Sequence, residues 1–241
     1  MQSKVIGILG GLGPKATADL FGRIINATPV TNEQDHLRII IDNNPKIPDR
    51  NLGILGKAES PLEELTNTAL NLERAGVEII AIPCNTAHYY LNDLRKSVSV
   101  PFMDMIAETG NYISKQFPEI KRLGLLATTT TIKTQLYQRK LKPRQILLPD
   151  SESQSRVMEA IYTVKGARPG FTHESARKEA LTVAQSLVAR GAEAIIVGCT
   201  ELSTVFSGQS FSVPLIDPLQ ILALAVVKEA KPGSKEQISG L

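Results

Sequence analysis

The fold is decided by two matching stretches, GVEIIAIPC at residues 76–84 and GAEAIIVGC at residues 191–199. Each begins with glycine, continues as an apolar run typical of a buried strand, and ends in cysteine. Downstream of each cysteine comes a Val-Pro-x-x-Asp segment, VPFMD at 100–104 and VPLID at 213–217. Both cysteines of the chain therefore stand at the same point of a repeated unit.

The repeat extends towards the N-terminal side of each unit. KVIGIL at residues 4–9 resembles KRLGLL at 121–126, and the chain length from the glycine to the following cysteine is nearly the same in both halves. A period of this size is too long for a solenoid repeat and suits a small domain. We expect a first domain of residues 1–104 plus 217–241 and a second of residues 105–216.

Apolar strand-like segments alternate with helix-like segments along the chain. This alternation predicts an α/β fold of two similar parallel sheets with helices on both faces. Strands are predicted near residues 4–9, 37–42, 78–82, 122–126, 145–148 and 193–197, and helices near 15–27, 60–75, 86–96, 105–116, 131–140, 153–163, 173–190 and 217–230.

Composition excludes several classes of protein. A chain of 241 residues, 42% apolar, can form one large or two small domains with a real core. The net charge is only +3 and no basic stripe with aromatics is present, so no nucleic-acid partner is expected. No apolar run is long enough to cross a membrane. The chain begins close to a strand-like stretch, and two strand-end thiols indicate a reducing, cytoplasmic setting.

Cys84 and Cys199 are the candidate catalytic residues. A free cysteine is often a small buried hydrophobe, but two in equivalent places, each before polar residues, favour chemistry. Both precede predicted helix starts, where backbone N–H groups favour a thiolate. A disulfide is not expected in a reducing compartment. A metal site is not expected either, because His and Asp residues do not cluster near both thiols.

A glycine-rich turn follows the first predicted strand. Gly11-x-Gly13-x-x-Ala16 matches the dinucleotide fingerprint, and Asp42 ends the next strand, where a ribose-binding acid could sit. The same turn is equally typical of a loop that brings the backbone close to a small anion. The structural alternative is a tight strand-to-helix turn, with Pro14 in the first helical turn.

The segment 42–51 contains two prolines and is predicted to be a loop. Arg50 in this loop is either a carboxylate-binding fork or, as its sequence context alone favours, a solvated charge. His88 stands four residues after Cys84, on the same face if a helix starts between them. Two roles are open for His88: a partner of Cys84 in a Cys–His dyad, or a hydrogen-bonded structural histidine.

Three motifs, in this order, resemble the cofactor-independent aspartate/glutamate racemases: ILGGLGPKAT at 8–17, PCNTAH at 83–88 and GCTEL at 198–202. The resemblance runs from about residue 4 to residue 230. It implies two similar α/β domains related by pseudo-two-fold symmetry, an active site in the cleft between them, one thiol on each face of the substrate's α-carbon, and commonly a homodimer.

Within that family, the loop ending in Arg50, together with Lys165, looks like the aspartate-selective branch. There an arginine and a lysine hold the side-chain carboxylate, so the expected substrate is an acidic amino acid, aspartate before glutamate. One departure is visible in ATTTT at 127–131, where Thr130 stands at a position that is commonly glycine. Thr130 either stiffens a helix start or crowds the pocket.

Racemisation removes a proton from one face of a carbon and returns one to the other, which suits matched thiols. No motif for pyridoxal phosphate or another cofactor is found, so donors around the α-carboxylate must stabilise the carbanion. Besides Arg50 and Lys165, the predicted substrate-binding residues are Gly11, Asn85, Thr86, Ala87, Thr128, Thr200 and Glu201; Glu201 and His88 are candidates for orienting the thiols or the ammonium group.

Other functions remain open at this stage. A dinucleotide-binding oxidoreductase would rest on the Gly11 turn and Asp42. A maleate isomerase or hydantoin racemase would share the two thiols without needing Arg50 and Lys165 together. A non-catalytic amino-acid-binding module would keep the pocket and show no turnover.

Overall fold

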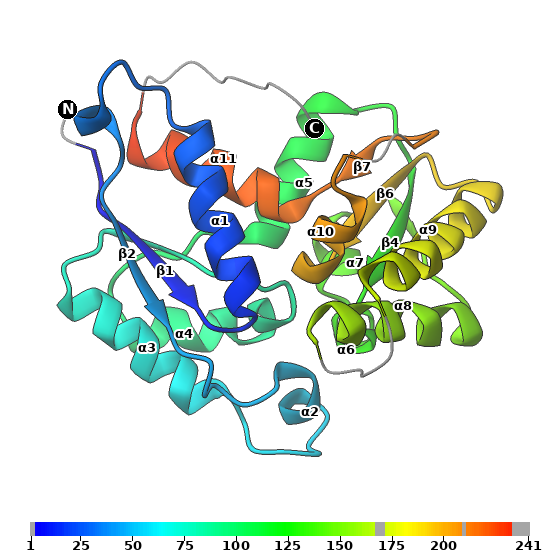
Figure 1. The fold of residues 1–241 in the computed structure, drawn as a ribbon, viewed down its shortest axis with the longest axis horizontal. Coiled ribbons are helices and arrows are strands. Elements are labelled where there is room, and N and C mark those ends of the chain that lie inside the picture. Colours follow the sequence, from blue (N-terminus) through cyan, green and yellow to red (C-terminus); the bar gives the residue numbers. More distant parts are fainter. Residues whose placement is uncertain (1–2, 167–171, 209–210, 233–241) are drawn as a thin grey trace. The chain divides into compact units, whose positions relative to one another are not determined.

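The computed structural model describes residues 3–166, 172–208 and 211–232 (Figure 1). The chain forms two compact units. The first runs to Glu108 and resumes at Leu219, and the second spans Thr109–Pro218. Each unit is a parallel-sheet α/β module, as the sequence predicts.

The sheet of the first unit has the strand order β2-β1-β3, with β1 (Ile6–Gly10), β2 (Ile39–Asn43) and β3 (Ile79–Ala81) all parallel. A parallel bridge from Ile80 to Phe102 extends the sheet beyond β3. Because all strands run the same way, their carboxyl ends lie on one edge, which is where ligands bind in such sheets.

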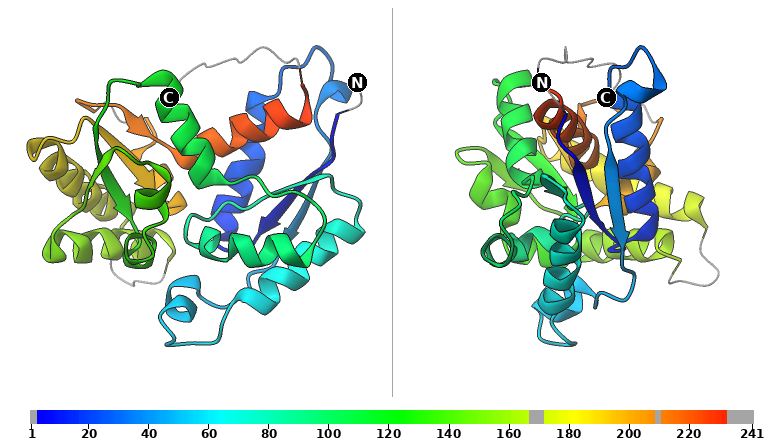
Figure 2. Two further views of the ribbon diagram at one scale, coloured as in Figure 1. Left: turned by 180° about the vertical axis from the view of Figure 1, so that it is seen from behind. Right: turned by 90° about the vertical axis from the view of Figure 1, so that its left-hand side faces the viewer.

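Two layers of helices cover this sheet (Figure 2). One face of β1 and β3 packs on α1 (Pro14–Ala27) and α11 (Pro218–Ala230), and the other on α3 (Leu62–Arg74) and α4 (Leu91–Ser97). Alternation along β1 explains this division, since Ile6 and Ile8 face one core and Leu9 the other. The unit also contains the short helices η1 (Glu33–Asp35), α2 (Arg50–Ile54) and η2 (Thr86–Tyr90).

The second unit has the strand order β5-β4-β6-β7, again all parallel. Its elements are α5 (Met105–Gln116), which begins in the first unit, β4 (Arg122–Ala127), α6 (Thr129–Lys133), α7 (Leu136–Lys140), β5 (Gln145–Leu147), α8 (Ser151–Val164), α9 (His173–Ala189), β6 (Ala194–Gly198), α10 (Thr200–Phe206) and β7 (Leu215–Ile216). Strands β4 and β6 share one core cluster with α8, α9 and α10.

Strand order shows that the module is duplicated. Strands β2, β1 and β3 of the first sheet take the places of β5, β4 and β6 of the second, and the Phe102 bridge takes the place of β7. Cys84 comes shortly after β3, and Cys199 comes directly after β6, the equivalent strand of the second sheet.

The repeated glycines end a helix in the same way in both units. Gly76 and Gly191 adopt left-handed backbones, with φ of 80° and 94°. After each, the next N–H bonds back to the last helical turn: Val77 to the Leu72 carbonyl at 3.3 Å and Ala192 to the Leu187 carbonyl at 3.0 Å. This is the Schellman ending, which glycine adopts without steric cost.

The repeated glutamates hold the start of the central strand. Glu78 accepts the Val5 N–H at 2.7 Å, and Glu193 accepts the N–H groups of Lys121 and Arg122 at 2.7 and 2.9 Å. Hydrogen bonds from the Arg122 and Lys121 backbone lower the pKa of the Glu193 carboxyl from its usual value. The Gly-x-Glu pattern therefore sets the spacing between the helix end and the cysteine-bearing strand.

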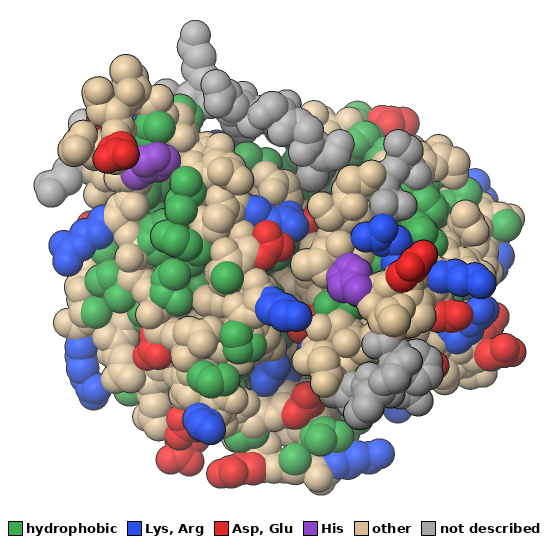
Figure 3. Space-filling model, viewed as in Figure 1, with side chains coloured by type: hydrophobic (Ala, Val, Ile, Leu, Met, Phe, Trp, Pro, Cys, Tyr) green, Lys and Arg blue, Asp and Glu red, His purple; other side chains and the backbone are tan. Residues whose placement is uncertain are grey.

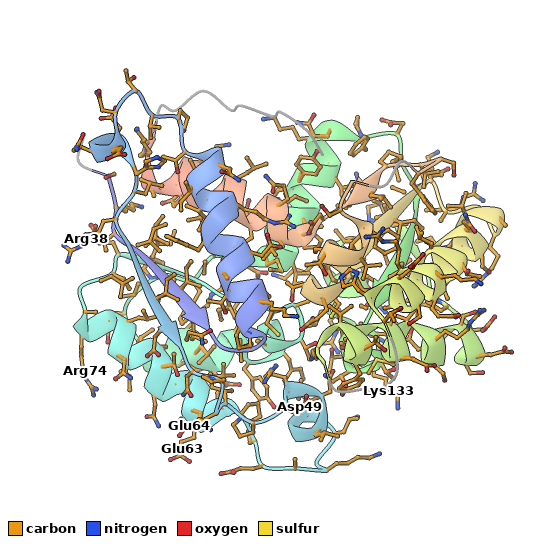
Figure 4. All side chains as sticks on the ribbon, in the orientation of Figure 1. Arg38, Asp49, Glu63, Glu64, Arg74 and Lys133 are labelled. Carbon is orange, nitrogen blue, oxygen red and sulfur yellow. The ribbon has the colours of Figure 1, made fainter. Side chains whose placement is uncertain are left out.

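Several element predictions need correction. The helix expected at 131–140 is two helices, because Gln135 has a left-handed backbone with φ of 56° between α6 and α7. The loop expected at 42–51 ends two residues early, since Asp49 caps α2 by accepting the Leu52 N–H at 2.9 Å. Figure 4 shows Asp49 at the start of that helix. The helix expected at 86–96 begins as the 3-10 turn η2 before continuing as α4.

In the described ranges no helix is both long and apolar enough to cross a membrane.

The first unit exposes some large apolar side chains on the outer side of α1 and β2: Phe21, Ile25 and Ile41. Hydrophobic side chains show on this face in Figure 3.

Candidate active site

Cys84 stands just beyond β3, at the carboxyl edge of the first sheet. Its N–H donates to the Ile82 carbonyl at 2.8 Å, which turns the chain sharply at Pro83. The thiol is partly exposed and packs at the edge of the core cluster that contains α3 and α4. The geometry leaves a free thiol at the strand end where the repeat predicts a reactive one.

His88 holds the backbone of Cys84 rather than its sulfur. Its Nδ1 lies 2.9 Å from the Cys84 carbonyl, and its Nε2 accepts the Met105 N–H at 3.1 Å. Since Nε2 accepts, the proton must be on Nδ1, which donates to the carbonyl. Burial lowers the pKa of His88, against a smaller raising effect of the Asp104 charge, so the ring is neutral. The structure supports the structural histidine and not the Cys–His dyad.

Cys199 is the N-cap residue of α10 and is buried, at 6% exposure. Its thiol donates to Glu201 Oε2 at 2.9 Å, and the Thr200 hydroxyl donates to the same oxygen at 3.3 Å. The thiol is thus held by a carboxylate that lies in the first turn of the same helix. Of the predicted site residues, Cys199, Thr200 and Glu201 form one hydrogen-bonded cluster.

Lys165 joins this cluster from the end of α8. Its Nζ lies 3.8 Å from Glu201 Oε1 and 5.4 Å from the centre of the Tyr162 ring. The side chains of Lys165 and Glu201 are 20% and 10% exposed, so the ion pair is largely shielded from water. The lysine predicted to hold a substrate carboxylate already contacts a carboxylate of the protein.

Arg50 is buried, and the expectation of a solvated charge is wrong. Its guanidinium donates to the carbonyls of Pro48, at 3.1 Å, Ile47, at 3.4 Å, and Leu12. Its Nε has no hydrogen-bond partner among the described residues although it is buried. A buried N–H of a charged group without a partner is costly, so this edge of the fork is suited to receive an anion.

The Gly11 turn brings two loops of the first unit together. Gly11 has a φ of 87°, and a side chain there would overlap the backbone of Asn44. Its N–H donates to the Thr17 hydroxyl at 3.0 Å, and Pro14 in the first helical turn has no N–H. Two donors that a pyrophosphate would use are therefore engaged or missing, which argues against the dinucleotide alternative. Asp42 accepts from Asn71 at 3.3 Å.

Thr128 takes the place in the second unit that Gly11 takes in the first, directly after the central strand. It caps α6, its Oγ1 accepting the Thr131 N–H at 3.2 Å, and it is 2% exposed. Thr130 is buried inside α6, and its carbonyl accepts the Thr134 hydroxyl at 2.7 Å. The residue that replaces the usual glycine is thus a well-packed part of a helix start.

The remaining predicted residues follow the two cysteines directly. Asn85, Thr86 and Ala87 are buried in and before η2, and Thr200 is buried in the first turn of α10. Each unit thus gathers its own predicted residues at the carboxyl edge of its sheet. That the two groups act on one substrate stays a prediction.

Sequence reasoning missed some supporting residues. Thr17 accepts the Gly11 N–H through its hydroxyl. A threonine in the first turn of the helix that follows the glycine-rich loop is a sequence signal that could have predicted this contact. Tyr162 lies one turn before Lys165, the i, i+3 spacing that places it under the ammonium group. Ser203 donates to Asp217 at 2.9 Å, and it stands four residues after Cys199 as His88 does after Cys84.

Each of the two parallel α/β modules carries a cysteine after the equivalent strand, in the motifs that resemble the racemase family. Comparison with known families agrees: the sequence model described as Asp/Glu/Hydantoin racemase matches residues 9–226. The chain belongs to this family of racemases.

The relatives include the broad specificity amino-acid racemase RacX of Bacillus subtilis, 29% identical over 92% of this chain and 96% of that protein. Among solved structures, an aspartate racemase from Picrophilus torridus superposes with a TM-score of 0.81 at 30% identity, covering 94% of each chain. An aspartate racemase homologue from Pyrococcus horikoshii gives a TM-score of 0.73 at 25% identity, covering 94% of this chain and 99% of that one.

Proposed function

We propose that the protein interconverts L- and D-aspartate with two thiols and no cofactor. The observation that carries the proposal is the equivalence of Cys84 and Cys199, each of which follows the same strand of a duplicated module at the carboxyl edge of its sheet. One thiolate takes the α-proton and the opposite thiol returns one, while the electron pair stays on carbon during the exchange. The roles of the thiols reverse for the other enantiomer.

Stabilisation of the carbanion is assigned to donors near the two cysteines. Asn85, Thr86, Thr128 and Thr200 are each buried at a strand end or helix start of their own unit, and each carries side-chain and backbone donors. Preorganised donors of this kind are effective because they need no rearrangement when charge develops. They would bind the α-carboxylate of the substrate.

Recognition of the second carboxylate is assigned to Arg50 and Lys165. The unpartnered, buried Nε of Arg50 supports an anion at the side edge of its guanidinium. Charge-assisted bonds contribute about 1.5–3 kcal/mol each, which separates aspartate from alanine by roughly one to two orders of magnitude per contact. A methylene group discriminates by about 1–3 kcal/mol, so glutamate is expected to be a weaker substrate.

Incubation with L-aspartate in D₂O tests the proposal. We expect α-deuterated aspartate and accumulation of D-aspartate, slower exchange with glutamate, and negligible exchange with alanine. Hydantoins serve as comparison substrates because the family includes hydantoin racemases. An absence of α-deuteration with every acidic amino acid would sink the assignment.

A homodimer and a cytoplasmic location stay predictions. Size-exclusion chromatography with light scattering measures the mass in solution and tests the homodimer.

A second candidate is an amino-acid racemase of broad specificity. The Lys165–Glu201 ion pair favours it, because that pair engages one of the two cations assigned to the second carboxylate. Rates on alanine and on aspartate decide between the two: comparable rates would support the broad-specificity enzyme.

A further inference from the structure

The second unit contains a linked row of three ionisable side chains. The Cys199 thiol donates to Glu201 Oε2 at 2.9 Å, and Lys165 Nζ lies 3.8 Å from Glu201 Oε1. Each carboxylate oxygen of Glu201 therefore faces a different partner. A single carboxylate therefore lies between the thiol and the lysine.

We propose that Lys165 moves between Glu201 and the second carboxylate of the substrate, and that its departure lets Glu201 take the proton of Cys199. The inference rests on the racemase function proposed above. A dicarboxylic substrate would then activate the thiol by binding, whereas a neutral amino acid would leave Lys165 on Glu201 and the thiol protonated.

The proton steps balance within this row. The S–H bond of Cys199 breaks with its electron pair left on sulfur, and an O–H bond forms at Glu201 Oε2. The thiolate then takes the α-proton, leaving the pair on carbon. In the reverse direction Cys199 gives its proton to the α-carbon and regains one from Glu201.

Electrostatics gives the direction of the effect. A nearby ammonium group favours the ionised form of a carboxylate, so with Lys165 in place the shared proton stays on sulfur. When Lys165 bonds instead to a substrate carboxylate, Glu201 loses its ammonium partner while its Oε2 stays beside the Cys199 sulfur. The neighbouring charged groups of this region make other contacts: His173 Nε2 lies 3.4 Å from the Thr204 hydroxyl, and Asp217 accepts from Ser203.

The ion pair is placed to respond to a ligand. The Lys165 side chain is 20% exposed and lies over the Tyr162 ring, while Glu201 is 10% exposed and fixed in the first turn of α10. A long lysine side chain rearranges readily about its four methylene groups, whereas the short helix holds Glu201 beside the sulfur. The lysine is therefore the mobile partner.

The first experiment measures the thiolate of Cys199 directly. The Cys84→Ser variant keeps Cys199 as its one thiol, and the ultraviolet absorbance of the thiolate is followed while succinate, a dicarboxylate that cannot be racemised, is added. We expect the absorbance to rise. The same titration in Cys84→Ser with Glu201→Gln should give no rise, and a rise of equal size there would overturn the proposal.

The second experiment separates the proposal from simple substrate binding. In Lys165→Met, Glu201 has lost its ammonium partner, so α-deuteration of alanine should increase about tenfold, equivalent to about 1.4 kcal/mol in the barrier, while that of aspartate falls. Lys178→Met, which removes an exposed charge from α9, should change neither rate. A Lys165→Met enzyme that is slower on aspartate and unchanged on alanine shows that the lysine only binds substrate.

The two failures are distinguishable. If wild-type protein does not deuterate aspartate, the racemase function itself is refuted. If it deuterates aspartate but succinate leaves the thiolate absorbance of Cys84→Ser unchanged, only the relay through Glu201 is refuted. The succinate titration keeps native Lys165, so the proposal stays testable if Lys165→Met does not fold.

Discussion

At the scale of single residues, the two thiols have different surroundings although they have equivalent places in the fold. Cys84 is partly exposed and its carbonyl is held by His88, whereas Cys199 is buried and its thiol is held by Glu201. A duplicated module has thus kept the position of the cysteine and changed its neighbours.

Replacing either cysteine should separate the two half-reactions. Cys84→Ser and Cys199→Ser should each lower racemisation to background, because a hydroxyl is far too weak a base at neutral pH to replace a thiolate. Each single variant should still eliminate HX from a β-substituted analogue of one enantiomer, which needs only one base. Full racemisation by either variant, measured by chiral chromatography, would contradict the two-base mechanism.

Arg50→Lys tests the buried fork. A lysine keeps the charge but not the planar pair of N–H donors, so kcat/KM for aspartate should fall about 10–100-fold. The change also removes bonds to the carbonyls of Pro48 and Leu12, so some loss of stability is expected. Thermal melting of the same variant separates the two effects, and wild-type kinetics would show that this arginine serves structure alone.

The buried His88 is expected to make the protein less stable in acid. Burial lowers its pKa, so below about pH 6.5 the unfolded chain binds a proton that the native ring does not. The free energy of unfolding should therefore fall as pH drops from about 6.5 towards the native pKa, by up to about 1.4 kcal/mol per pH unit.

His88→Gln should flatten this acid-side slope, because glutamine does not titrate. Urea unfolding of wild type and variant at about pH 5 and pH 7 measures the slope. An unchanged slope in His88→Gln would show that other groups cause the acid sensitivity.

At the scale of elements, the repeated Gly-x-Glu pattern joins a helix end to the cysteine-bearing strand. The glycine ends α3 or α9 with a left-handed residue, and the glutamate bonds to the start of the central strand. Two consecutive contacts thus fix where the strand begins. The register of the strand then determines where the cysteine emerges.

Gly76→Ala should destabilise the protein by about 1–2 kcal/mol, the cost of a left-handed backbone at a residue with a Cβ. Among the described residues no atom lies within 4 Å of the added methyl group, so the variant measures backbone strain and not steric overlap. Gly22→Ala is the matched control. It lies inside α1 with equal space around it and should stabilise by about 0.5–1 kcal/mol. Equal effects of the two changes in urea unfolding would refute the argument.

The errors in predicting elements have identifiable physical causes. Gln135 ends α6 although the polar-apolar pattern of 131–140 reads as one continuous helix. Strand β7 has only two residues, Leu215 and Ile216, and exists because it pairs with β6. No periodic signal marks so short a strand, since its hydrogen bonds come from a distant part of the sequence.

At the scale of the whole molecule, the chain is expected to work without metal or cofactor. Within the ranges that the structure describes, no group of three or more His, Cys, Asp or Glu side chains is placed to hold a metal ion. The proposed two-thiol mechanism needs no metal, so racemisation should continue after exhaustive dialysis against EDTA. Activity that is lost on dialysis and restored by a divalent metal or by pyridoxal phosphate would contradict the mechanism.

The sequence by itself determined the duplicated parallel α/β architecture, the family and the place of the two cysteines. It could do so because strand and helix periodicity, glycine at helix ends and motif order are local properties of the chain. Only the tertiary structure decided that Arg50 is buried against three carbonyls, that His88 holds a backbone and that Lys165 is paired with Glu201. These partners lie on different loops and helices of a unit, and no local pattern reports which side chains folding brings within a few ångströms of one another.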